Sequence, residues 1–238
     1  MAFIEMQAVT KQYRLGEATI HALRGVDLQI EPGEFIAVWG PSGSGKTSLL
    51  NLIGLIDRPT SGRITFEGRD VLSLNDNESA ELRNRKVGFI FQTFNLIPVL
   101  NAFENVMLPL QLQGLETRQA SEKAMERLEE VGLGQQAFAR PDQMSGGQRQ
   151  RVAIARALIA SPAVIIADEP TANLDSDTSN RIISLMRELN DKEGVTFIFS
   201  THDPRLLSYV KRSIKLEDGR MKMGEKHELS EARVSQHP

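Results

Sequence analysis

The chain of 238 residues is long enough to bury a substantial hydrophobic core and is compatible with a single α/β domain. Hydrophobic residues make up 40% and charged residues 25% of the sequence, as in an ordinary globular protein. The net charge of −3 argues against a strongly basic nucleic-acid-binding surface, and the absence of cysteine excludes disulfides and thiolate metal sites.

The N-terminal part is predicted to form strands. Alternating apolar and polar residues predict a first strand at residues 3–9, ending near Tyr13, and a second strand at 26–30. Residues 21–25 between them are interpreted as a turn. The N-terminus lacks the layout of a signal peptide, and no apolar run reaches the ~20 residues of a membrane helix. We therefore expect any membrane role to depend on a partner.

A glycine-rich segment lies between the next predicted strand, at 35–39, and a helix that begins near Ser48. This order is typical of a phosphate-binding P-loop, in which backbone N–H groups face the phosphates. Lys46 can then supply a positive charge to the outer phosphates, and the Thr47 hydroxyl can ligate Mg²⁺. The predicted nucleotide-binding residues here are Gly40, Pro41, Ser42, Gly43, Ser44, Gly45, Lys46, Thr47 and Ser48.

Strands and helices alternate through the rest of the chain, except for a helical block in the middle. The P-loop helix is expected to end near Pro59, because proline disfavours helix in the residue before it. Hydrophobic periodicity predicts strands at 63–66, 87–91, 163–167 and 195–199, the third of them central and parallel, and a hairpin of 213–216 and 221–223. Helices are expected at 103–112, 121–131, 145–159 and 177–189, in a polar segment at 77–85, and as a short helix after Pro204. The polar tail after Gly224 is expected to be frayed.

A second glycine-rich helix start lies in the helical block. Ser145 is a good N-cap, and Gly146 and Gly147, followed by Gln148, remove Cβ atoms from a surface that a phosphate would meet. A simple helix cap explains the same pattern, so the phosphate-binding interpretation depends on the other motifs.

Polar residues at the ends of predicted strands are the candidates for catalysis, because ligands bind outside the carboxyl ends of strands in open parallel sheets. Asp168 is placed to hold Mg²⁺, and Glu169 to orient and deprotonate an attacking water. His202 can hydrogen-bond a γ-phosphate, and Gln92 can touch both metal and water. Tyr13 is a candidate for stacking on a base, which these arguments alone leave open.

Together the motifs resemble those of the ATP-binding subunit of ABC transporters, over the chain as far as about Gly224. Residues 40–47 match its Walker A segment, 144–148 its signature, 164–168 its Walker B segment and 172–175 its D-loop. The resemblance implies catalytic roles for Glu169, His202, Gln92 and Lys46, and metal contacts from Thr47, Gln92 and Asp168. It also implies nucleotide contacts from Tyr13, Asp168, His202 and Gln92, and from Ser145, Gly146, Gly147, Gln148 and Asp175.

The resemblance implies a P-loop NTPase core of the ABC-ATPase type, an α/β fold with an N-terminal antiparallel β subdomain. A helical subdomain would be inserted at about 95–160, within an ATPase domain at 1–224 that precedes a polar tail at 225–238. ATP and Mg²⁺ are the implied cofactors, and hydrolysis of ATP to ADP and phosphate is the implied reaction. The implied partners are a second ATPase subunit, most simply a second copy, and a membrane permease that docks at the cleft near Gln92.

A finer resemblance is to the MacB/LolD-like branch, carried by residues 87–92, 94–98, 104–106, 167–171 and 173–175. It implies a place at the cytoplasmic face of the inner membrane, where the ATPase dimer drives a permease in lipoprotein release, efflux or transmission of force.

Two other functions explain less of the sequence. A soluble ABC ATPase acting on nucleic acid or ribosomes would tend to carry two ATPase domains or long insertions, and the slightly acidic charge disfavours it. A P-loop kinase for a small molecule does not explain the signature segment or the pair Glu169 and His202. We therefore favour the transporter ATPase and expect no nucleic-acid partner.

Overall fold

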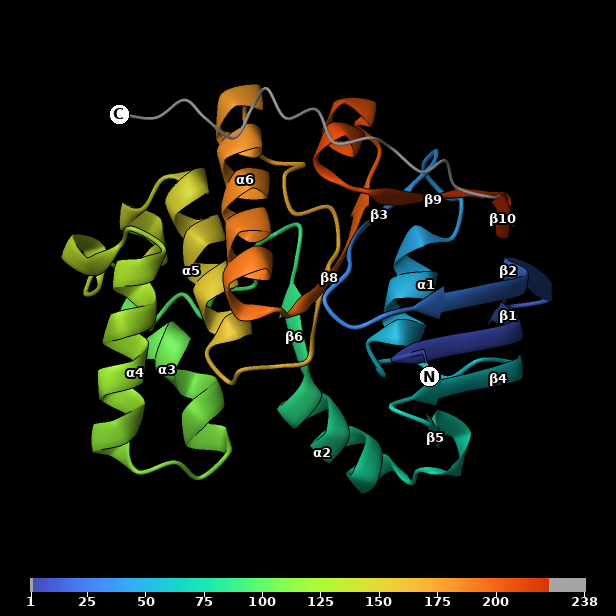
Figure 1. The fold of residues 1–238 in the computed structure, drawn as a ribbon, viewed down its shortest axis with the longest axis horizontal. Helices are drawn as coiled ribbons and strands as arrows, with labels where there is room; N and C mark the ends of the chain where they lie inside the picture. Colours follow the sequence, from blue (N-terminus) through green and yellow to red (C-terminus); the bar gives the residue numbers. More distant parts are fainter. Residues whose placement is uncertain (1, 223–238) are drawn as a thin grey trace.

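The computed structural model describes residues 2–222, which form an α/β fold with two sheets (Figure 1). Part of the last predicted hairpin strand, at Met223, and the predicted tail at 225–238 lie outside the described residues. The strands are β1 (Ile4–Leu15), β2 (Ala18–Ile30), β3 (Phe35–Trp39), β4 (Ser61–Phe66), β5 (Arg69–Asp70), β6 (Val87–Ile90), β7 (Val164–Ala167), β8 (Thr196–Thr201), β9 (Arg212–Glu217) and β10 (Arg220–Lys222). The helices are α1 (Lys46–Ile53), α2 (Asp76–Lys86), α3 (Ala102–Leu112), α4 (Thr117–Glu130), α5 (Gly146–Leu158) and α6 (Ser176–Glu193), and a short 3-10 helix lies at Pro204–Tyr209.

The larger sheet has six strands in the order β10-β9-β3-β8-β7-β6. All neighbouring pairs are parallel except β9 with β10. The prediction of a parallel strand at 163–167 is confirmed, but β7 lies next to the edge strand β6 and is not central in the sheet. In this register Trp39 lies opposite Thr201, and Ala167 lies opposite both Phe199 and Ile90. The loops that follow β3, β6, β7 and β8 therefore all leave the sheet at one edge.

The smaller sheet is antiparallel, with the order β2-β1-β4-β5. The prediction of a turn at 21–25 is wrong, because these residues lie inside β2 and the chain turns instead at Gly16 and Glu17. Leu15 pairs with Ala18 across that turn. Gly25, at φ +78°, lies where the register between β1 and β2 shifts, so it marks an irregularity within a strand.

The two faces of the larger sheet bury different helices. Ile36 and Val38 of β3 point to a core that includes α1 and the antiparallel sheet, whereas Phe35 and Ala37 point to a core with α5 and α6. This alternation follows from the two-residue period of a strand. In Figure 1, α1 lies with β1 and β2 on one side of β3 and β8, and α5 and α6 lie on the other.

Helix α1 ends earlier than predicted, at Ile53 and not near Pro59. Leu55 adopts a left-handed conformation, with φ +57°, which cannot continue a right-handed helix. Its side chain is only 5% exposed, so burial in the core accompanies the reversal of the chain.

The helical block has a hydrophobic core of its own, made by α3, α4 and α5. The three helices predicted there are present. Asn101 and Ser145 cap α3 and α5 through reciprocal capping boxes with Glu104 and Gln148. Across residues 2–222, no helix combines the length and the apolar character that crossing a membrane requires.

Candidate active site

The loop between β3 and α1 requires glycine at its two ends. Gly40 and Gly45 have φ values of +154° and +103°. A Cβ on Gly40 would lie 2.0 Å from the Leu216 carbonyl oxygen, and one on Gly45 would lie 2.4 Å from the Ala22 carbonyl oxygen. Strands β9 and β2 therefore hold the loop closely at both ends, and no larger residue fits without moving them.

Lys46 begins α1 and is almost fully buried, at 6% exposed. Its Nζ donates to the carbonyl oxygens of Gly40 (2.9 Å) and Pro41 (3.0 Å) and lies 3.9 Å from Glu169 Oε1. Beside it, the Ser44 hydroxyl is buried and has no hydrogen-bond partner among residues 2–222. A buried ammonium and an unpaired buried hydroxyl in one loop fit a polyphosphate, whose oxygens accept from both.

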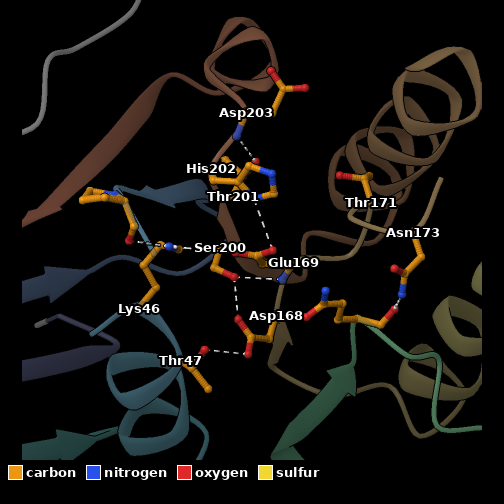
Figure 2. A network of polar contacts seen from close by, with 12 residues as sticks. Lys46, Thr47, Asp168, Glu169, Thr171, Asn173, Ser200, Thr201, His202 and Asp203 are labelled. Carbon is orange, nitrogen blue, oxygen red and sulfur yellow. Dashed lines mark hydrogen bonds and ion pairs between the residues drawn. The ribbon is translucent and has the colours of Figure 1, made fainter. Parts of the chain in front are cut away.

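Two hydroxyl groups orient the carboxylate at the end of β7 (Figure 2). Thr47 Oγ1 donates to Asp168 Oδ2 over 2.9 Å, and Ser200 Oγ donates to Asp168 Oδ1 over 2.6 Å. Oxygen ligands of this kind suit Mg²⁺, which keeps several waters and takes few ligands from the protein. Thr47 and Asp168 are therefore a fitting pair to hold this ion, as predicted for them.

Glu169 lies between two groups that can be cationic. Its Oε1 faces the Lys46 ammonium, and its Oε2 lies 3.2 Å from His202 Nδ1. The backbone of Glu169 is left-handed, with φ +45°, and its N–H donates to Ser200 Oγ over 2.8 Å. The side chain is 23% exposed, so solvent water reaches a carboxylate held beside the P-loop. A carboxylate in this position can accept a proton from an attacking water.

The segment after β6, which contains Gln92, is connected to two other elements. Asn173 Nδ2 donates to the Gln92 carbonyl oxygen over 2.9 Å. Phe94 and Asn95 are both left-handed, with φ of +63° and +48°. Arg156 of α5 donates to their carbonyl oxygens, over 2.9 and 2.6 Å. The main chain at Gln92 thus lies beside the D-loop, and the strained backbone that follows is held by α5.

Tyr13 lies beside the first turn of α1. Its OH donates to Asp57 Oδ2 over 3.0 Å and lies 3.4 Å from Ser48 Oγ. The Lys11 ammonium is 4.9 Å from the centre of the ring and also donates to Asp57. Burial raises the pKa of Asp57, but hydrogen bonds from Lys11, the Arg58 N–H and Tyr13 lower it more, so this pKa lies below its usual range. The tyrosine, 36% exposed, is thus fixed at its hydroxyl end.

The residues of the predicted signature form a helix start on another part of the molecule. Gln148 N donates to Ser145 Oγ, and a Cβ on Gly147 would lie 2.7 Å from Thr178 Cγ2 at the start of α6. Asp175 caps α6 by accepting from Thr178 N, and its hydrogen bonds with Thr178 lower its pKa. In the described part of the chain, no hydrogen bond or ion pair joins residues 145–148 to the P-loop. One copy therefore does not bring the two glycine-rich segments together.

The sequence-based search missed several residues that hold this site. Ser200 connects Asp168 to Glu169, while Lys11 and Asp57 hold Tyr13, and Arg156 holds the segment after Gln92. A usable signal existed only for Ser200, which is a polar residue inside a strand whose other central members are apolar. The others act through contacts between residues that lie 44 or more positions apart in the sequence.

A family model described as ABC transporter matches residues 23–172. The chain is 49% identical over 92% of its length to a macrolide export ATP-binding/permease protein, MacB, of Syntrophobacter fumaroxidans, but spans only 31% of that relative. It is 46% identical to a lipoprotein-releasing system ATP-binding protein, LolD, of Anaeromyxobacter dehalogenans, with 96% of both chains covered.

Solved structures match as well. A dimeric structure of the ATP-binding cassette MJ0796 of Methanocaldococcus jannaschii, in a post-hydrolysis state bound to ADP and Pi, has a TM-score of 0.86 and 43% identity. The match covers 94% of this chain and 98% of that one. It confirms the predicted fold class.

Proposed function

The chain belongs to the ABC transporter family, and we propose that it is the ATPase subunit that drives an inner-membrane permease of the MacB or LolD type. The prediction of an ATP-binding and ATP-hydrolysing subunit is confirmed at the level of the family, and the soluble alternative is not favoured. The observation that carries the proposal is one cluster at the carboxyl edge of the sheet, formed by Lys46, Thr47, Asp168, Glu169 and His202. We place the subunit at the cytoplasmic face of the membrane, held there by the permease.

The binding half of the proposed reaction belongs to the P-loop. Its backbone N–H groups, the Ser44 hydroxyl and the Lys46 ammonium bind the phosphates of ATP, and Lys46 exchanges its carbonyl partners for phosphate oxygens. Thr47, Asp168 and Gln92 would hold Mg²⁺, which would neutralise phosphate charge. Tyr13, which is 36% exposed and is held at its hydroxyl by Asp57, stacks on the adenine.

Glu169 and His202 carry out the hydrolysis step of the proposed reaction. Glu169 orients the attacking water and accepts its proton, and a positioned base of this kind accelerates a reaction by typically ~10²–10⁴-fold. His202, which lies 3.2 Å from that carboxylate, donates a hydrogen bond to the γ-phosphate. Both side chains come from the same edge of the sheet as the P-loop, so no large rearrangement is needed to assemble them.

A second copy completes the site. Residues 145–148 begin α5, and α5 lies on the opposite side of the larger sheet from α1 (Figure 1). We propose that these residues and Asp175 of one copy close over the ATP bound by the P-loop of the other. The MJ0796 cassette, whose solved structures are dimeric, supports this arrangement.

The conformational change that ATP causes reaches the permease through the helical block. We propose that residues 95–160 move as a subdomain of the ATPase domain at 1–224, and that the permease docks at the cleft beside Gln92. Asn173 and Arg156 tie the intervening segment to the D-loop and to α5, so closure at the ATP is transmitted to it.

The test is the variant Glu169→Gln. We expect it to keep ATP affinity, to lose turnover by roughly 10²–10⁴-fold because the base is removed, and to accumulate an ATP-bound dimer. Radiolabelled ATP binding, phosphate release and size-exclusion chromatography measure the three properties.

The matched control is Glu126→Gln, which changes an exposed glutamate of α4 and should leave turnover at the parent rate. Parent-level hydrolysis by Glu169→Gln itself would refute the role of Glu169 as the base.

A further inference from the structure

We propose that Ser200 is a positioning residue of the ATPase site, whose hydroxyl fixes the Asp168 carboxylate and the Glu169 backbone at the same time. The inference rests on the proposed function, because it assigns Ser200 a part in the use of Mg²⁺ and ATP. No motif in the sequence analysis gave this residue a role.

The hydrogen bonds of Ser200 have a fixed direction. The residue lies in β8 with no exposed surface. The Glu169 N–H can only donate, so Ser200 Oγ accepts from it over 2.8 Å. The one hydroxyl hydrogen is then available for Asp168 Oδ1, at 2.6 Å, which as a carboxylate oxygen accepts. One buried hydroxyl therefore satisfies two neighbouring residues of the site.

The bond to Asp168 restricts rotation of its carboxylate. Ser200 engages Oδ1 while Thr47 engages Oδ2, so both oxygens are occupied by hydroxyl donors from different elements (Figure 2). Hydrogen bonds to a charged acceptor are stronger than those between neutral groups. If Thr47 turned its hydroxyl oxygen toward Mg²⁺, the bond from Ser200 would still hold the Asp168 carboxylate in place.

The bond to Glu169 supports an unfavourable backbone. A left-handed conformation is uncommon for a residue other than glycine, and Glu169 has φ +45°. The same conformation turns its side chain from the end of β7 toward Lys46 and His202. Anchoring the N–H of Glu169 to β8 therefore fixes the direction in which the proposed base points.

The experiment compares Ser200→Ala with Thr196→Val in the full chain. Thr196 belongs to the same strand, is 1% exposed, and accepts a hydrogen bond from the Gly33 N–H at the other end of β8. Both variants lose a buried hydroxyl, but only Ser200→Ala changes the site. Turnover is measured with saturating ATP, and ATP affinity is measured both with Mg²⁺ and with EDTA.

For Ser200→Ala we expect kcat to fall roughly 10–100-fold, the usual effect of removing a hydrogen-bond partner behind a metal ligand. ATP affinity should fall with Mg²⁺ present and stay within about twofold of the parent in EDTA, because the P-loop contacts are intact. Thr196→Val should match the parent in kcat and in ATP affinity. A kcat within twofold of the parent, or an equal loss of affinity in EDTA, would overturn the proposal.

Ser200→Cys covers the case in which the alanine variant does not fold, because a thiol has a similar shape and is a weak donor. It should show a smaller fall in kcat and in the ATP affinity measured with Mg²⁺, and an unchanged ATP affinity in EDTA. A parent-like kcat would again overturn the proposal. If the parent chain itself neither binds nor hydrolyses ATP, the proposed function fails, whatever Ser200 does.

Discussion

At the scale of single residues, the site is a set of charges whose partners come from separate segments. Lys46 donates to the carbonyl oxygens of Gly40 and Pro41, and Glu169 lies within 3.9 Å of its ammonium. A buried ammonium needs such partners, since burial of an unpaired charge is costly. Phosphate oxygens can replace the carbonyl oxygens at little cost, because the lysine is already desolvated and aligned.

Replacement of this lysine should therefore weaken nucleotide binding itself. We expect Lys46→Ala to lower ATP affinity roughly tenfold or more, because hydrogen bonds that involve a charged group contribute about 1.5–3 kcal/mol. Titration with a fluorescent ATP analogue measures the affinity.

The control is Lys123→Ala, which changes an exposed lysine of α4 and should bind like the parent. An unchanged ATP affinity in Lys46→Ala would contradict the proposal that this loop binds the phosphates of ATP.

At the scale of elements, parallel pairing decides which loops meet. The ends of β3, β6, β7 and β8 lie at one edge of the sheet, although residues 40–47 and 196–202 are far apart in the chain. A different kind of contact connects the segment that follows α1 to the antiparallel sheet. There the Lys11 ammonium donates to Asp57 over 2.6 Å and to the Arg58 carbonyl oxygen over 2.8 Å.

The contact between Lys11 and Asp57 should make a pH-dependent contribution to folding. Because the folded state lowers the pKa of Asp57, its contribution is complete above the pKa of an unfolded aspartate, about 3.9, and is lost as the pH falls through the lower folded-state pKa. We expect Asp57→Asn to reduce the free energy of unfolding by about 1 kcal/mol at pH 7. The difference should shrink in acid, and urea unfolding at pH 7 and pH 3 measures it.

Asp76→Asn provides the comparison, since Asp76 pairs with Arg58 but its side chain is 97% exposed. It should change the free energy of unfolding by less than about 0.5 kcal/mol at either pH. An Asp57→Asn difference that grew in acid would contradict the direction of the pKa shift.

At the scale of the whole molecule, the sheet separates the two glycine-rich helix starts. Helix α1 packs on one face with the antiparallel sheet, while α5 and α6 pack on the other. Under the proposed function, a nucleotide held by the P-loop of one copy would meet residues 145–148 of a second copy.

This arrangement predicts complementation between two inactive variants. Lys46→Ala removes the P-loop half, and Ser145→Asp keeps the N-cap of α5 while adding a charge that repels phosphate. We expect each variant alone to be inactive, and a mixture to recover part of the parent turnover, because mixed dimers contain one intact composite site. Phosphate release from the separate and mixed proteins measures this, and a mixture as inactive as its components would contradict a shared site.

The sequence by itself determined the motifs and most elements of the fold. Residues 40–47 predict the P-loop because their glycines and lysine are local requirements of phosphate binding. The strands at 163–167 and 195–199 were predicted because apolar periodicity is also local. Where several local signals competed, the prediction failed. Gly25 favoured the prediction of a turn where β2 continues, and the proline at 59 led to a predicted end of α1 that is later than the observed end at Ile53.

Only the tertiary structure decided how distant residues share one site. The pairing of β7 with β8 brings Ser200 to Asp168 and Glu169, which lie more than thirty residues earlier in the chain. In the same way, Asp57 reaches Tyr13 and Arg156 reaches Phe94 through packing that no local pattern encodes. The physical reason is that hydrogen bonds form between atoms brought together by folding, whereas sequence patterns report only the preferences of neighbours along the chain.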